Sequence, residues 1–64
     1  MIKKYSVSLV YQNRLNDKIE LILRASIVDA VSTEEALGKL HLLCTEELPE
    51  HSLFLQTVIE IENN

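Results

Sequence analysis

Hydrophobic and polar residues alternate along three separate stretches of the chain, residues 3–11, 19–28 and 53–62. One face of the first stretch holds Tyr5, Val7, Leu9 and Tyr11. One face of the second holds Ile19, Leu21, Leu23, Ala25 and Ile27, and one face of the third holds Leu53, Leu55, Thr57, Ile59 and Ile61. A period of two, rich in β-branched and aromatic residues, is typical of β-strands. We therefore predict three strands, with Asn63 and Asn64 as a tail.

The spacing of apolar residues changes between the second and third stretches. It becomes helical, and the apolar stripe consists of Ala36, Leu37, Leu40, Leu43, Cys44 and Leu48. Ser32 is a favoured N-cap, and Glu35 three residues later completes the pattern of a capping box. Pro49 ends the helix, because the residue before a proline avoids helical geometry. We predict a helix over about residues 33–47.

Residues 12–18 are polar and predict a turn between the first two strands. A hairpin with Tyr5 opposite Ala25 brings Tyr11 opposite Ile19 and places both apolar faces on one side of the sheet. A slip of one residue would destroy this match. Asp29 would then point inward, so we expect the second strand to end or bulge near residues 27–29.

These elements define one small α+β domain, residues 1–64, in the order β-β-α-β. A right-handed crossover through the helix places the first strand in the centre of a three-stranded sheet, in strand order 2-1-3. The helix packs on one face of this sheet. The side chains expected beneath it are Tyr5, Val7, Leu9, Leu21, Leu23, Leu55 and Ile59.

The length of 64 residues limits the size of the core. A chain this short buries only about 60% of its unfolded surface, and small domains often add disulfides, a metal or a second subunit. Cys44 is the only cysteine, so no internal disulfide forms, and the cysteine and histidines lack zinc spacing. We predict no cofactor, no metal and no membrane segment, and a reduced, cytoplasmic environment.

The net charge is −4, with five basic and two acidic residues in positions 1–24 and one basic and eight acidic residues after them. The predicted sheet interleaves the two halves, because Lys4 comes to lie near Glu60 or Glu62. An acidic patch remains at the end of the helix, formed by Glu46, Glu47 and Glu50. Nucleic acid is an unlikely ligand for this charge, because phosphate contacts need lysine and arginine.

Three residues are candidates for chemistry. His41 lies at the border of the apolar stripe, His51 lies in the loop after the helix, and Cys44 lies within the stripe. Each lacks a second oriented group at catalytic spacing, and a free cysteine in an apolar stripe is typical of a core residue. We predict that the protein is not an enzyme.

The face of the sheet opposite the helix is the stronger candidate for function. Alternation gives it Val10, Ile22, Phe54 and Val58, and no element of the chain is available to cover it. Exposed apolar patches mark interaction sites. A smaller candidate on the outer side of the helix pairs Gly38 with Leu42. We predict a homodimer joined through the open sheet face, with pairing of the sheet edges as the competing geometry.

The junction formed by Ala30, Ser32, Glu34, Glu35 and Ala36 recurs in small α+β proteins. This layout resembles that of short proteins encoded by phages and mobile elements, some of them anti-CRISPR inhibitors. The resemblance covers about a dozen residues and implies no site residue. We predict a non-enzymatic protein that self-associates and binds another macromolecule, with an inhibitor role implied by the resemblance. The alternatives are a structural subunit of an enzyme assembly and a nucleic-acid-binding dimer.

Overall fold

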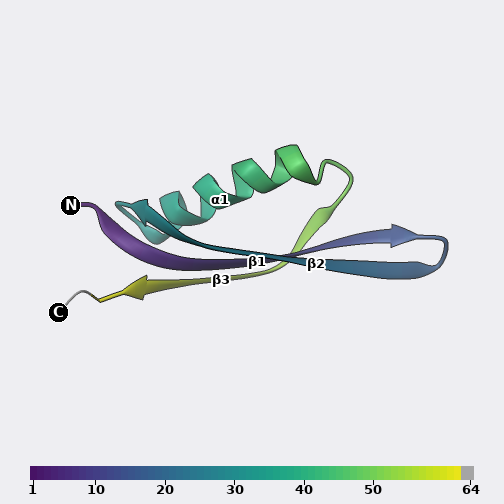
Figure 1. Cartoon of the computed structure of the whole chain (residues 1–64), viewed down its shortest axis with the longest axis horizontal. Helices are drawn as coiled ribbons and strands as arrows, with labels where there is room; N and C mark the ends of the chain where they lie inside the picture. The colour runs from purple at the N-terminus through teal and green to yellow at the C-terminus, as the bar shows by residue number, and fades with distance from the viewer. Residues whose placement is uncertain (63–64) are drawn as a thin grey trace.

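The computed structural model describes residues 1–62, and the predicted tail of Asn63 and Asn64 lies outside the described residues. The elements are strand β1 (Lys3–Leu15), strand β2 (Lys18–Ala30), helix α1 (Thr33–Glu47) and strand β3 (Ser52–Ile61). The strand order is β2-β1-β3, and β1 is antiparallel to both neighbours. Helix α1 lies on one side of this sheet (Figure 1). The predicted α+β fold is confirmed.

The turn between β1 and β2 is shorter than predicted. Only Asn16 and Asp17 connect the strands, and both have positive φ angles, 49° and 66°. Two successive residues with positive φ are typical of the type I′ turn, whose twist matches that of a hairpin. The polar residues before the turn therefore continue β1, and the β1–β2 ribbon extends beyond the helix (Figure 1).

This short turn changes the register of the hairpin. Tyr5 lies opposite Val28, and the predicted pairing of Tyr5 with Ala25 is wrong. The difference of three positions is odd, so β2 presents the opposite face to the helix. Alternation alone could not decide between the two registers, because both faces of residues 19–28 carry large apolar side chains.

The side chains beneath the helix consequently differ from those predicted. Opposite partners in an antiparallel pair share a face, so Ile22, Arg24 and Val28 of β2 lie on the side of α1. Leu21 and Leu23 lie on the open side instead.

The third strand shows the same reversal. Val58 pairs with Val7 and lies beneath the helix, whereas Leu55 and Ile59 lie on the open face. A bulge between the partners of Val10 and Tyr11 inserts Phe54 as an extra residue and returns Leu53 to the helix side. The bulge predicted near residues 27–29 is absent, since β2 pairs with β1 without interruption as far as Ala30.

Helix α1 begins and ends where the sequence predicts. The Ser32 hydroxyl accepts a hydrogen bond of 3.1 Å from the backbone N–H of Glu35. The Glu35 carboxylate forms an ion pair with Lys39 at 3.2 Å, so only the serine half of the capping box is present. At the other end, the N–H of Leu48 donates to the carbonyl of Cys44 at 2.8 Å, just before Pro49.

The core lies between the helix and the centre of the sheet and is small. Its fully buried members are Tyr5, Val7, Leu9, Tyr11, Ala30, Ala36, Leu40 and Cys44. Half-buried residues packed against it include Leu37 and Leu48, as predicted, but Leu43 is exposed. Four of the eight core side chains come from β1, so the central strand supplies most of the buried side chains of the sheet.

Candidate interaction surface

The open face of the sheet carries many of the large apolar side chains that the described residues expose. It combines the outward side chains of all three strands, and its large members are Leu21, Leu23, Ile27, Leu55 and Ile59. Each of them is more than half exposed. Helix α1 occupies the other side of the sheet (Figure 1). Contiguous apolar surface of this kind is uncommon on a monomer, which makes the open face a candidate interaction surface.

The six residues predicted for the interface lie in different places. Val10 is half-buried in the middle of the open face. Ile22 and Val58 lie on the helix side, where Val58 packs against the core. Phe54 is the exposed bulge residue. A second set on the outward side of α1 consists of Gly38 and Leu42, and no atom lies within 4 Å of a Cβ built on Gly38.

The open face is apolar and exposed, as the sequence predicts, but two of the residues predicted for it, Ile22 and Val58, lie on the helix side instead. The outward set of β2 was assigned to the core because it is the more regular apolar face of that strand. The signal that could have reversed the assignment is Asn16-Asp17, a pair suited to a two-residue hairpin turn. A hairpin closed there fixes Leu15 opposite Lys18 and turns the regular apolar face away from the helix.

Charged side chains on the open face stand at its ends. Lys4 and Asp29 lie side by side at the end near the chain terminus, and Lys4 Nζ donates to Asp29 Oδ1 at 3.0 Å. Arg14 lies opposite Ile19 at the end near the hairpin turn. The middle of the face carries uncharged residues from all three strands, among them Ser6, Ser8 and Thr57.

Two further ion pairs join the basic first half of the chain to its acidic second half. Lys3 contacts Glu60 at 3.3 Å, and Arg24 contacts Glu47 at 3.4 Å. The predicted interleaving of the charges is confirmed, although Lys4 pairs with Asp29 and not with Glu60. Glu46 and Glu50 of the acidic helix end are exposed. Each pair is exposed, and exposed pairs contribute at most about 1 kcal/mol to stability.

A short, partly buried polar contact joins β1 to α1. The Tyr11 hydroxyl and His41 Nδ1 are 2.7 Å apart, and their rings are nearly parallel. Burial raises the pKa of Tyr11 to about 12, and the Cys44 thiol beside the hydroxyl adds to the shift. Tyr11 is therefore protonated at neutral pH. Sequence reasoning placed His41 at the border of the apolar stripe but missed its partner on another element.

This contact has the properties of a structural hydrogen bond. A raised tyrosine pKa disfavours the phenolate that nucleophilic or base chemistry would need. Cys44 is buried, as expected for a core cysteine. His51, the other histidine, pairs with Glu20 at 3.0 Å on the helix side of the sheet.

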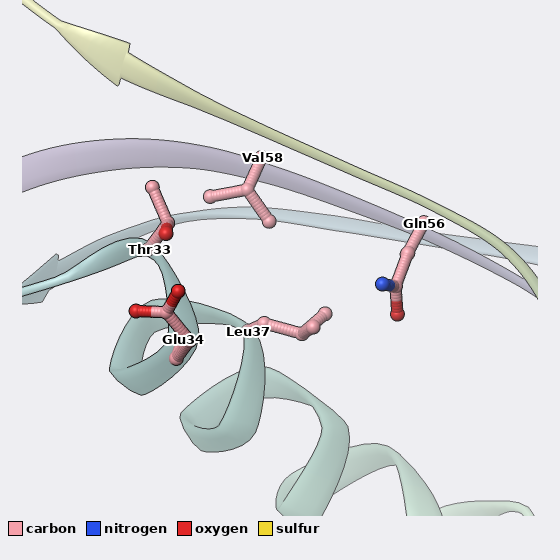
Figure 2. Close-up of a pocket in the computed structure, with 5 residues that line it drawn as sticks. All are labelled: Thr33, Glu34, Leu37, Gln56 and Val58. Carbon is pink, nitrogen blue, oxygen red and sulfur yellow. The ribbon is translucent and has the colours of Figure 1, made fainter.

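A shallow groove separates the first turns of α1 from β3. Figure 2 shows its lining of Thr33, Glu34, Leu37, Gln56 and Val58. The groove holds one acidic group and no histidine or cysteine. Among residues 1–62, no cluster of three or more histidine, cysteine or acidic side chains is placed to hold a metal ion.

No helix within the described part of the chain is long and apolar enough to cross a membrane. Comparisons with protein-family models, with curated proteins and with solved structures found no match.

Proposed function

We propose that this chain is a small, non-enzymatic interaction protein that self-associates as a homodimer through the open face of its sheet. The observation that carries the proposal is the apolar centre of that face, with Leu23, Leu55 and Ile59 more than half exposed. The dimer then binds another macromolecule with the surfaces that remain free. The single buried cysteine suits the reduced environment of the cytoplasm.

The energetics are compatible with an occupied face. Full burial of a leucine or isoleucine contributes about 1.5–3 kcal/mol, so covering the five half-exposed side chains of each copy contributes on the order of 10 kcal/mol per dimer. Association costs about 4–15 kcal/mol. The two quantities are comparable, and the small core described above leaves the chain dependent on further burial.

A matched pair of variants tests this proposal. Ile59 on the open face and Leu42 on the outward side of α1 are 60% and 65% exposed, so a lysine disturbs the folded monomer equally little at either position. In size-exclusion chromatography with light scattering, Ile59→Lys should elute as a 7.3 kDa monomer, and Leu42→Lys should keep the mass of a dimer.

The reverse pattern would assign self-association to the helix, and dimers from both variants would favour edge pairing of strands. A wild type that is monomeric and captures a larger chain through Ile59 would instead support the structural-subunit alternative. An inhibitor role remains a prediction from the resemblance to short phage-encoded proteins.

A further inference from the structure

The open face is built of transverse rows, each with one residue from every strand. Ser8 lies between Ala25 and Thr57, and these three form the small row. Large residues occupy the β2 and β3 positions of the rows on either side. The leucine row, toward the hairpin turn, consists of Leu23, Val10 and Leu55, and the isoleucine row consists of Ile27, Ser6 and Ile59. Beyond the isoleucine row lies the charged row of Asp29, Lys4 and Ile61.

This alternation gives the face a trough with a ridge on each side. Successive rows are about 6.6 Å apart, since each is two residues further along the strands. If the large residues of a covering surface lay on the large residues of this face, the two surfaces would be held apart. Voids would then remain above the small row. Protein interiors are close-packed, so a stable cover must place its own ridge in the trough.

We propose that the cover is a second copy of this chain, stacked face to face with its strands antiparallel to those of the first. The two-fold axis passes midway between the small row and the leucine row. The leucine row of each copy then lies on the small row of the other, with Leu23 over the partner's Ala25 and Leu55 over the partner's Thr57. This inference rests on the self-association proposed above and specifies its geometry.

The other two-fold arrangements fit less well. An axis parallel to the strands, or one that passes through a row, places large residues on large residues. An axis between the small row and the isoleucine row brings the leucine row onto the charged row. That arrangement covers the Lys4–Asp29 pair with apolar side chains, and desolvating an ion pair is costly. At its centre, the proposed axis combines complementary sizes with uncharged rows. Further out, the same axis brings Ile27 onto the partner's Leu21, and the charged row onto the row of Arg14 and Ile19.

Two features favour a second copy over a different partner. In a two-fold interface each residue meets the same surface on its partner, so a charged centre would repel itself, and this centre is uncharged. The size also fits. A stable interface takes about 800 Å² per partner, roughly a sixth of the 4844 Å² of accessible surface. The face runs along the longest dimension, 48 Å, of the molecule.

The stacked dimer would have four layers, helix, sheet, sheet and helix. Two such sheets pack about 10 Å apart, with strands crossing at about −30°. Both helices lie on the outside, so each copy keeps the outward side of α1 available to another macromolecule.

A size swap tests the stacking. Ala25→Leu fills the trough and should raise the dimer dissociation constant at least about tenfold, because overpacking is destabilising. Leu23→Ala removes the ridge and should also weaken the dimer. The double variant Leu23→Ala/Ala25→Leu exchanges ridge and trough, and it should recover most of the affinity that Ala25→Leu loses. Glu46→Leu adds the same side chain on exposed helix surface and should leave the dissociation constant unchanged.

Dissociation constants come from sedimentation velocity over a dilution series, with circular dichroism to confirm that each variant is folded. The swap Leu55→Thr/Thr57→Leu repeats the test on β3 and replaces the first if a β2 variant unfolds. An unchanged dissociation constant for Ala25→Leu would overturn this stacking but leave self-association in place. The same holds if the double variant dimerises no more tightly than Ala25→Leu. A wild type that stays monomeric would overturn both.

Discussion

The Tyr11 hydroxyl of β1 and the His41 imidazole of α1 form a partly buried hydrogen bond of 2.7 Å. This contact ties the helix to the central strand. Burial of the phenol raises the pKa of Tyr11 from 10.0 to about 12.

The raised pKa predicts a loss of stability at alkaline pH. The unfolded chain releases the Tyr11 proton near pH 10.0, whereas the folded chain keeps it until about pH 12. The stabilisation is therefore complete below pH 10.0 and is lost as the pH rises toward 12. Urea denaturation should show the free energy of unfolding of the wild type falling more steeply over this range than that of Tyr11→Phe. Parallel curves for the two proteins would contradict the assignment.

The helix cap predicts a modest, purely structural effect. Ser32→Ala removes the acceptor for the Glu35 N–H and should lower the free energy of unfolding by about 1 kcal/mol. Ser26→Ala, at an exposed strand position without a cap, serves as the control and should change it by less than about 0.5 kcal/mol. If Ser32→Ala kept full stability but lost partner binding, the Ser32 region would be a functional site.

The register of the hairpin can be tested with two leucines. Leu40 is 8% exposed and Leu21 is 58% exposed. In the Ile59→Lys background, where the account expects monomers, Leu40→Ala should cost about 2–5 kcal/mol of unfolding free energy. Leu21→Ala should cost well under half as much. Equal costs, measured by urea denaturation, would place Leu21 in the core and support the register with Tyr5 opposite Ala25.

The outward side of α1 offers a test of partner contact. Gly38 lies within the helix, and a Cβ added there meets no atom within 4 Å, so Gly38→Ala should stabilise the folded chain by about 1 kcal/mol. Thermal unfolding measures this gain. A variant that is more stable yet binds its macromolecular partner less tightly would show that the partner approaches the helix backbone at Gly38.

Much of the architecture follows from local patterns in the sequence. Ser32 and Pro49 mark the ends of the helix, and alternation marks the three strands, because these signals act within a few residues. The strand order follows from connection geometry, which leaves β1 as the central strand. Val7 and Leu9 enter the core as predicted because one face of β1 is apolar and the other largely polar.

The faces of β2 and β3 did not follow from the pattern, because each strand is apolar on both sides. Which face of each strand lies beneath the helix then depends on the two-residue turn and on the bulge at Phe54. The alternation of apolar and polar residues predicts neither feature. The presence of apolar residues on both faces of a strand also bears on the proposed dimer. A strand with two apolar faces can pack under its own helix and still offer a surface to a second copy.

The central claim is that this surface joins two copies of the chain, and sedimentation equilibrium of the wild type tests it most directly. The account predicts a mass that rises with concentration to twice 7.3 kDa and stops there, since a two-fold face-to-face contact is closed. A mass of 7.3 kDa at every concentration, up to the millimolar range, would contradict it.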